Sequence, residues 1–285
     1  MSKPGTDDAS IRRSTVQSYS TRGSKAYEDP MNKNFLYGDI TVRFIDRIAF
    51  GPADKVILDI GCGTGFVFDE LYDVFLEHGM RGIGIEPAEG MRRIAVEKYG
   101  DDPMFDIVEG SFERIPLADR SVDKIISTLA LHWVRSLEVA AVEMRRVLRD
   151  TGSLDILMIA KDDGANFKKA IVAALRKHLT FAQLMDTATL VQRVRPAEVK
   201  AAFAAFDDHF TVDVAKFTDI VYGTFDEHMK WWTARSTPVI AEVRDKDRFM
   251  IDLRTELEKI GTEKGIPFDT AYYWITAKAK DDGQN

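Results

Sequence analysis

Short, continuous apolar runs recur along the first 160 residues of the chain. They lie at residues 56–60, 81–86, 105–110, 122–128 and 153–160. Each run is five to eight residues long and is bounded by polar or glycine-containing segments. Runs of this length predict buried β-strands, because a strand covered on both faces needs apolar side chains at successive positions.

Segments with helical spacing of their apolar residues separate these runs. The spacing predicts helices at 33–49, 66–79, 90–100 and 137–152. Glycine stands at or near the end of each of the last three, as is typical of helix C-termini. Strands that alternate with helices predict an α/β fold, in which right-handed crossovers place helices on both faces of a parallel sheet.

The alternation stops after residue 160. Residues 165–206 predict helices only, and this block interrupts the sheet. Two further segments, 209–224 and 268–280, alternate apolar and polar residues as strands do, with two helical segments between them. Two late strands connected in this way are expected to pair as an antiparallel edge of the sheet.

The pattern divides the chain into four parts. They are a polar N-terminal arm (1–32), a core (33–160), a helical insertion (161–207) and a C-terminal part that completes the sheet (208–285). The arm has few apolar residues to bury by itself. We therefore expect it to pack over the ligand site or on a neighbouring subunit of a homo-oligomer.

Composition and charge narrow the function classes. The 285 residues are 45% hydrophobic and carry a net charge of −7, which disfavours a nucleic-acid partner. We expect no membrane contact, since no run of about 18 apolar residues occurs, and the N-terminus lacks the apolar core of a secretory signal. Cys62 is the only cysteine, so no internal disulfide is possible and a cytoplasmic location fits.

The stretch VILDIGCGTGF (56–66) carries the clearest candidate site. Its glycines, Gly61, Gly63 and Gly65, lie between the first strand and the following helix, where glycine lets a ligand approach the backbone. Asp59 precedes the glycines, and Glu86 ends the second strand, where a carboxylate can accept both hydroxyls of a ribose. A tight turn without a ligand is the alternative.

A nicotinamide dinucleotide is the other nucleotide that such a turn can hold. Its fingerprint is G-x-G-x-x-G, in which the third glycine allows close packing of the helix. Phe66 occupies that third position in this chain. The spacing therefore argues against a dinucleotide.

The segment LDIGCGTG followed by GIE resembles the nucleotide-binding core of class I S-adenosylmethionine-dependent methyltransferases. Residues 109–134 and 143–157 resemble later segments of the same family, and the resemblance covers about residues 53–160. It implies S-adenosyl-L-methionine as cofactor. It also implies a doubly wound, mostly parallel, seven-stranded Rossmann-like sheet with a helical lid after the fifth strand.

The resemblance also implies roles for individual residues. Asp59 and the backbone of Gly61 and Gly63 should hold the methionine part of the cofactor, and Glu86 the ribose. Ser111 replaces the usual aspartate of the family, so adenine recognition falls to its hydroxyl or to the Phe112 amide. The predicted cofactor-binding set is completed by Cys62, Gly65, Pro87, Met91, Ser111, Phe112 and Leu129. For Cys62, a space-filling role is favoured over that of a nucleophile.

Three residues are candidates for the catalytic set. An N-terminal tyrosine commonly caps the cofactor in the family, and Tyr19 or Tyr27 can serve here, with packing of the arm as the alternative. His132 is either a general base or a residue that shapes the cofactor site. No metal site is expected, because the other histidines lack ligand spacing and the acidic pairs are typical of solvated loops.

The remaining features concern the acceptor. The Asn/Asp-Pro-Pro-Tyr motif of amino-methylating enzymes is absent, since Ser-Thr-Leu-Ala stands at 127–130. Apolar residues in 165–206 favour a small apolar acceptor, such as a terpenoid or aromatic compound, methylated at carbon or oxygen; packing of the insertion itself explains them equally well. Of Trp231 and Trp232, one is expected in the core and one at the pocket. The alternative functions are a non-catalytic S-adenosylmethionine-binding protein and a nicotinamide-dependent oxidoreductase.

Overall fold

The computed structural model describes residues 35–188, 194–235, 240 and 242–280 of the chain. The described part contains seven strands, which form a single sheet. They are β1 (Val56–Ile60), β2 (Arg81–Ile85), β3 (Phe105–Val108), β4 (Val122–Thr128), β5 (Leu148–Ile159), β6 (Phe210–Gly223) and β7 (Ile266–Ala279). The helices are α4 (Tyr37–Ile45), α5 (Phe66–His78), α6 (Glu89–Tyr99), α7 (Leu137–Val147), α8 (Ala165–Leu175), α9 (Phe181–Ala188), α10 (Pro196–Ala202), α11 (Phe225–Arg235) and α13 (Lys246–Glu258), with 3₁₀ turns η2 (Leu131–Trp133) and η3 (Phe203–Phe206).

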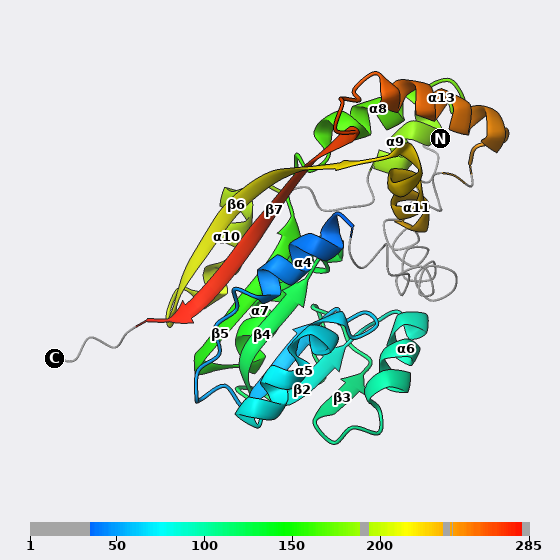
Figure 1. Cartoon of the computed structure of the whole chain (residues 1–285). Coiled ribbons are helices and arrows are strands. Elements are labelled where there is room, and N and C mark those ends of the chain that lie inside the picture. Colours follow the sequence, from blue (N-terminus) through cyan, green and yellow to red (C-terminus); the bar gives the residue numbers. More distant parts are fainter. Residues whose placement is uncertain (1–34, 189–193, 236–239, 241, 281–285) are drawn as a thin grey trace, which may run out of the picture.

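The strands follow the order β3-β2-β1-β4-β5-β7-β6 across the sheet (Figure 1). β1 to β5 pair in parallel, whereas β7 runs antiparallel to both β5 and β6. The order reverses direction between β1 and β4, and ligands of open parallel sheets bind at the carboxyl ends of the strands beside such a reversal. The predicted α/β fold with a mostly parallel seven-stranded sheet and an antiparallel edge is confirmed.

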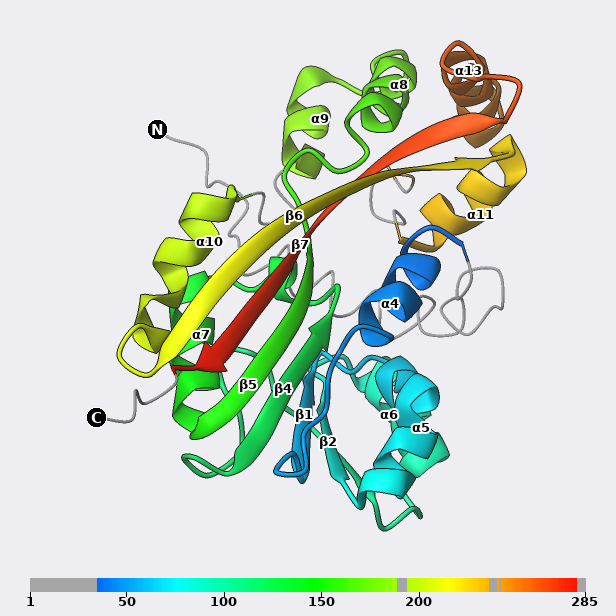
Figure 2. The same ribbon diagram turned by 60° about the vertical axis from the view of Figure 1, so that its left-hand side comes forward.

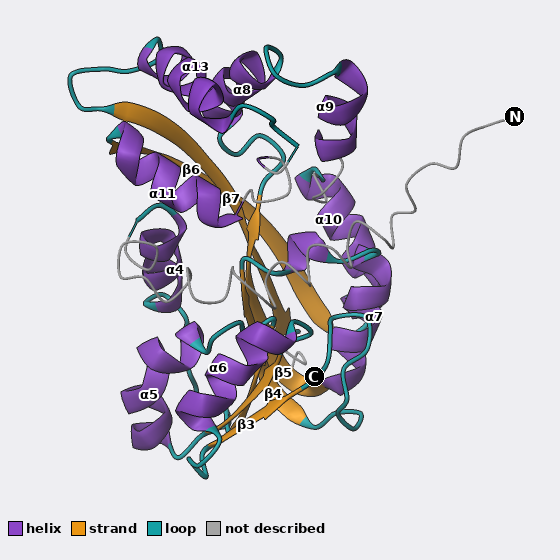
Figure 3. Cartoon of the chain, turned by 90° about the vertical axis from the view of Figure 1, so that its right-hand side faces the viewer, coloured by secondary structure: helices purple, strands orange, loops and turns teal. Residues whose placement is uncertain are grey.

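Helices cover both faces of the sheet (Figure 3). α4, α5 and α6 lie on one face, and α7 and α10 lie on the other. Residues of β1 alternate between the two cores: Ile57 belongs to the apolar cluster on the α5 face, and Leu58 and Ile60 to the cluster on the α7 face. Asp59 shares the side of Ile57, because successive side chains of a strand point to opposite faces.

The helix predicted over 137–152 ends earlier, at Val147. Leu148 has extended φ and ψ values of −76° and 132° and pairs with Val122 of β4. Gly152 therefore lies inside β5 instead of closing a helix. The helical pattern continued to Gly152 in the sequence, but pairing with the neighbouring strand decides the conformation of these residues.

A two-stranded ribbon extends beyond the parallel strands (Figure 2). β6 and β7 pair along their full lengths, whereas only Tyr272–Lys278 of β7 pair with β5. The part of β7 before Tyr272 therefore has β6 as its one strand partner in the sheet. Helices α8, α11 and α13 gather at this end, and α8 packs on α13 and on β7.

The helical insertion contributes to two places. α8 packs at the end of the ribbon, whereas α10 and η3 pack on α7 and β6 over the sheet. Five of the insertion's larger apolar side chains are at most 7% exposed and belong to the two apolar clusters, namely Phe167, Leu175, Leu179, Phe203 and Phe206, whereas Phe181 of α9 is 78% exposed. Packing of the insertion itself accounts for the five buried side chains, so they give no support for an apolar acceptor.

The core position expected for one tryptophan of α11 is confirmed, because both are buried in the same apolar cluster. That one of them lines a pocket stays a prediction. Trp231 is 5% exposed and packs edge-on against Tyr37 and Phe268, while Trp232 is 8% exposed and packs against Phe249 of α13. Adjacent residues of a helix point in different directions. Here each direction meets a separate part of the same apolar cluster, because the ribbon and α13 lie on two sides of α11.

Candidate functional site

The turn after β1 has the backbone conformation that its glycines predict. Gly61, Gly63 and Gly65 have φ values of +73°, +58° and +91°, which residues with a Cβ rarely adopt. The N–H groups of Gly61 and Cys62 both donate to the carbonyl oxygen of Ile85, at 2.8 and 3.1 Å. These bonds hold the turn against the carboxyl end of β2.

The three glycines differ in what approaches them. A Cβ on Gly61 would lie 2.4 Å from the Cβ of Ala130, and one on Gly65 would lie 2.6 Å from the Tyr99 ring. At Gly63 the nearest atom would be Cε of Met91, at an ordinary contact distance of 3.6 Å. Gly61 and Gly65 are thus required by the packing of the chain itself, whereas at Gly63 only the positive φ favours glycine.

Two carboxylates lie beside this turn. Asp59 is 1% exposed, and neither of its carboxylate oxygens has a hydrogen-bond partner among the described residues. Glu86 is 8% exposed and accepts from the N–H of Gly63 at 3.1 Å and from that of Ala88 at 2.7 Å. A buried carboxylate without a partner is costly. A ligand that brings a hydrogen-bond donor or a positive charge would therefore stabilise the carboxylate of Asp59.

The electrostatics agree with this geometry. Burial, and then the neighbouring charge of Glu86, raise the pKa of Asp59 well above its ordinary value. Burial also raises the pKa of Glu86, although its bonds from Ala88 and Gly63 and the charge of Arg92 act in the opposite direction. A cation bound between the two groups would favour their ionised forms.

Cys62 lies in the same turn and is 5% exposed. A Cβ on Gly84 of β2 would come within 2.9 Å of its sulfur, so the thiol fills the space above that strand. Burial, and then the charges of Asp59 and Glu86, raise the pKa of Cys62 well above its ordinary value. A thiol with a raised pKa is a poor nucleophile at neutral pH.

The other predicted cofactor residues surround the turn from three elements. Met91 of α6 is buried with its Cε facing Gly63, and Phe112 is buried near Gly61. Pro87 is exposed directly after β2. Ser111 is partly exposed and exchanges backbone hydrogen bonds with Arg114, which holds the loop after β3.

The segment after β4 crosses over the glycine turn. Leu129 has a φ of +54°, an uncommon value for a residue with a branched side chain, and its N–H donates to Leu157. Ala130 then meets Gly61, and His132 lies in η2 with 3% exposure, its ring 5.1 Å from that of Trp133. Backbone strain of this kind is frequent at ligand sites.

The structure thus brings the predicted residues from 59 to 132 together at the carboxyl ends of the parallel strands. Tyr19 and Tyr27 lie outside the described residues. In the described part of the chain, no three metal-ligating side chains gather to hold an ion. None of the helices described is both long and apolar enough to cross a bilayer.

Sequence reasoning missed two residues near the site. Arg92 of α6 donates to the backbone oxygens of Glu86 and Pro87, at 2.8 and 3.3 Å, and so fixes the end of β2. Ala130 was missed because its role depends on a contact with a residue far away in sequence. Its small size next to an apolar run was the one available signal.

One of the acidic pairs that the sequence assigns to solvated loops is Asp162-Asp163, and this prediction is wrong for its second member. The side chain of Asp163 is fully buried, accepts from the Tyr37 hydroxyl and forms an ion pair with Lys168 at 3.0 Å. Asp162 is exposed and pairs with Lys216. Only the three-dimensional structure distinguishes these two neighbours.

A comparison with known protein families identifies the domain that contains this site. Residues 58–156 match the model of the methyltransferase domain family. The chain contains a class I S-adenosylmethionine-dependent methyltransferase domain. The matched range spans the glycine turn, both acidic residues and the segment around His132, so this domain contains the whole described site.

Two curated relatives and one solved structure illustrate the similarity of the methyltransferase domain and of the fold. An uncharacterised methyltransferase of a Geobacillus species is 36% identical over 124 residues, which are 43% of this chain and 55% of the relative. The malonyl-[acyl-carrier protein] O-methyltransferase of Geobacter sulfurreducens is 26% identical over 272 residues, covering 90% of this chain and 95% of the relative. A structure of Haemonchus contortus phosphoethanolamine N-methyltransferase 2 superposes with a TM-score of 0.60 at 14% identity, over 98% of this chain and 61% of that one.

The matches do not cover the full length of every relative. The chain spans 55% and 63% of the lengths of the first two curated relatives, both of which are methyltransferases without an assigned substrate. Similarity to the solved structure shows the fold. The methyltransferase domain and its cofactor class are therefore established most firmly, and the acceptor requires a separate argument.

Proposed function

We propose that the protein transfers the methyl group of S-adenosylmethionine to an oxygen of an acyl group carried on an acyl carrier protein. The observation that carries the methyl-transfer part is the buried carboxylate of Asp59, which has no partner among the described residues and lies beside Glu86 at the carboxyl ends of β1 and β2. A ligand that brings positive charge and hydroxyl donors satisfies both groups.

The residues present fit the cofactor. S-adenosylmethionine has an ammonium group for Asp59 and two ribose hydroxyls for Glu86. Glu86 already accepts two backbone N–H groups, but each carboxylate oxygen can accept more than one hydrogen bond. An added Cβ on Gly63 would meet no close contact, so the packing of the chain itself does not account for a glycine there. These features favour cofactor binding, which the catalytic and the non-catalytic alternatives share.

The acceptor class is supported by the relatives. The Geobacter sulfurreducens relative, which aligns over 90% of this chain, is named for O-methylation of malonyl-[acyl-carrier protein]. A Methylococcus capsulatus enzyme of the same name is 36% identical over 127 residues. We therefore propose oxygen, and not carbon, as the methylated atom, and a carrier-linked acyl group in place of a free terpenoid or aromatic compound.

The chemistry required of the protein is modest for such an acceptor. When bound, the cofactor supplies a methyl group activated by its attachment to a positively charged sulfur. A carboxylic acid with a pKa of about 4 is ionised at neutral pH, so the acceptor needs no general base. The contribution of the chain is then alignment and exclusion of water, which can supply about 7–11 kcal/mol in favourable cases.

His132 has a defined place in this proposal. It is buried in η2, two residues after Ala130, which contacts Gly61 of the turn. With an ionised acceptor, its proton-accepting ability is not used, and the ring shapes the wall of the site. A hydroxyl or carbon acceptor would instead require His132, or another group, to remove a proton.

Transfer of a labelled methyl group tests the proposal. The protein is incubated with S-adenosylmethionine that carries a labelled methyl group, together with malonyl-loaded acyl carrier protein. We expect label in a base-labile ester on the carrier, and none with the unloaded carrier. Label transferred only to aromatic or terpenoid alcohols would overturn the acceptor assignment. Calorimetric binding of S-adenosylhomocysteine without transfer to any acceptor would indicate a non-catalytic protein, and enhanced NADH fluorescence a nicotinamide enzyme.

A further inference from the structure

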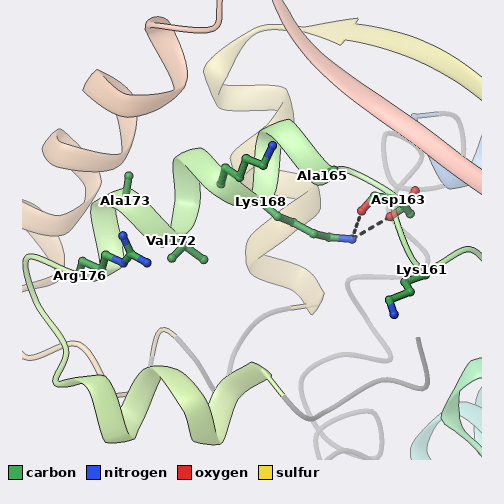
Figure 4. Close-up of a pocket in the computed structure, with 8 residues that line it drawn as sticks. Lys161, Asp163, Ala165, Lys168, Val172, Ala173 and Arg176 are labelled. Carbon is green, nitrogen blue, oxygen red and sulfur yellow. Dashed lines mark hydrogen bonds and ion pairs between the residues drawn. The ribbon is translucent and has the colours of Figure 1, made fainter. Parts of the chain in front are cut away.

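The outward face of α8 carries an unusual concentration of positive charge for an acidic protein. The chain has a net charge of −7. Lys161 precedes this helix, and Lys168, Lys169 and Arg176 lie along it, lining a hollow of about 370 Å³ (Figure 4). Lys161, Lys169 and Arg176 are exposed. Their spacing places Lys168 and Lys169 of α8 and Arg176, which directly follows its last residue, on one side of the helix.

An apolar residue lies within this basic surface. Val172 is 39% exposed and lines the hollow between Lys168 and Arg176. Val172 follows Lys168 and Lys169 by four and three residues and precedes Arg176 by four, so they are neighbours on the helix surface. An apolar centre with a charged rim is typical of protein-binding surfaces.

The inner wall of the hollow is rigid. Asp163 accepts from the Tyr37 hydroxyl and from the N–H of Ala271, the latter at 3.1 Å, and its side chain is fully buried. It holds the ammonium group of Lys168 at 3.0 Å. Lys168 therefore takes part in a network that joins α4, α8 and β7, and its position does not depend on a binding partner.

The hollow and the methyl-donor site both lie beyond the carboxyl ends of parallel strands of the sheet. Asp163 follows the carboxyl end of β5, while Asp59 and Glu86 lie at the carboxyl ends of β1 and β2. β5 is two places from β1 in the sheet, since β4 lies between them. Neighbouring strands are about 4.8 Å apart, so β1 and β5 are separated by about 10 Å across the sheet. Asp59 pairs with Ile126 of β4, which pairs with Asp155 of β5, so the end of β5 at Ile159 lies four residues, or about 13 Å, farther along the strands than Asp59.

On the basis of the carrier-linked acceptor proposed above, we propose that the basic face of α8 docks an acidic acyl carrier protein. This face consists of Lys161, Lys168, Lys169, Val172 and Arg176. The exposed Lys161, Lys169 and Arg176 attract and orient the acidic partner. Lys168 is paired with Asp163 and fixes the wall of the hollow, and Val172 supplies an apolar contact at the centre. From this position the acyl group of the carrier passes over the end of β5 toward the methyl donor.

Charge reversal tests the docking face. The double variant Lys169→Glu/Arg176→Glu is compared with a matched control, Lys200→Glu/Lys278→Glu, whose two exposed lysines lie on α10 and β7. Binding of malonyl-loaded carrier protein is measured by calorimetry with S-adenosylhomocysteine present. We expect the α8 variant to bind at least about tenfold more weakly and the control to bind like the unchanged protein. Thermal melting checks that both variants fold.

Salt dependence provides a second measurement. Rising ionic strength should weaken carrier binding to the unchanged protein, because the proposed contacts are exposed charges. The α8 variant should show a smaller salt dependence. Equal affinity of the two double variants would overturn the docking face, as would absence of carrier binding to the unchanged protein.

Kinetics separate this inference from the proposed function. A malonyl thioester of a small thiol lacks the carrier protein, so the α8 variant should methylate it as well as the unchanged protein does. With the loaded carrier, the variant should show a raised KM and an unchanged kcat. If neither acceptor is methylated, the proposed function fails, and the calorimetric comparison still decides on docking. If both are methylated and KM is unaffected by the substitutions, the function stands and the docking face is wrong.

Discussion

Gly61 and Ala130 are in such close contact that the backbone of one fits directly against the methyl group of the other. A Cβ added to Gly61 would lie 2.4 Å from the Cβ of Ala130. Gly61 follows β1, and Ala130 lies just beyond β4. This contact joins the turn expected to hold the methionine part of the cofactor to the segment that contains His132.

Substitution of Gly61 should therefore be far more damaging than substitution of a glycine with similar backbone geometry. We expect Gly61→Ala to destabilise the protein by more than about 2 kcal/mol, because backbone strain is added to a steric clash. Gly79→Ala is the matched control, since Gly79 has a φ of +57° and no atom within 4 Å of an added Cβ. It should cost about 1–2 kcal/mol and leave S-adenosylhomocysteine binding intact. Equal losses of stability and binding in the two variants would show that the contact is unimportant.

Removing the charge of Asp59 should separate stability from binding. Asp59→Asn eliminates a buried negative charge that has no partner among the described residues. We expect the cofactor-free variant to melt at a higher temperature, by about 2–4 °C for each kcal/mol gained. Saturating S-adenosylhomocysteine should raise the melting temperature of the unchanged protein but hardly that of the variant. A variant that is less stable without ligand and still binds it normally would contradict the role of Asp59.

The same residue should influence how stability depends on pH. Burial, followed by the charge of Glu86, raises the pKa of Asp59 in the folded protein. The folded state then holds this proton more tightly than the unfolded state, so the contribution of Asp59 to stability falls as pH rises above its unfolded pKa of about 3.9. Denaturant titrations at several acidic pH values give the free energy of unfolding of both proteins. The value for Asp59→Asn minus that for the unchanged protein should grow as pH rises. A difference independent of pH would be inconsistent with a raised pKa.

Glu86 should contribute to affinity through its hydrogen bonds. Glu86→Ala removes the proposed ribose acceptor together with the bonds from Gly63 and Ala88. We expect S-adenosylhomocysteine to bind about 10- to 100-fold more weakly, in line with the loss of charged hydrogen bonds. Glu86→Gln keeps the size and one acceptor oxygen and should lose less. The ribose assignment would have to be abandoned if calorimetry gave unchanged affinity for the alanine variant.

His132 distinguishes between acceptor chemistries. If the acceptor is a carboxylate, His132→Gln should reduce kcat by less than about tenfold. The dependence of kcat on pH should then have the same shape near pH 6.5 in the variant and in the unchanged protein. Removal of a true general base typically costs a factor of about 10² or more. A loss of that size, together with loss of the inflection, would indicate a hydroxyl or carbon acceptor and would count against the carrier-linked carboxylate.

Much of the fold follows from local patterns. VILDI forms a buried strand, and alternation in 268–280 correctly predicts a late strand, because each depends on the burial of its own side chains. The end of the helix predicted over 137–152 was wrong, since Leu148 pairs with Val122 and that long-range contact is absent from any local pattern. The antiparallel pairing of β6 and β7 was predicted because these two strands are consecutive in the sequence, with only helices between them.

The site was predictable where chemistry and position coincide. Asp59 and Glu86 could be located because a carboxylate at the end of a buried strand is conspicuous in the sequence. The burial of Asp163 could not be predicted, since Tyr37, which donates to it, lies 126 positions earlier in the chain. The cofactor roles of Ser111 and Leu129 remain predictions, and those of Tyr19 and Tyr27 fall outside the described residues.

The ribbon formed by β6 and β7 has an evolutionary consequence. Its outer half shares no ladder hydrogen bonds with β1, β2 or β4 within the described sheet. Insertions or substitutions in the helices that it supports therefore leave the register of the donor-binding strands unchanged. Lineages can remodel that end of the molecule for new acceptors while inheriting the donor site intact.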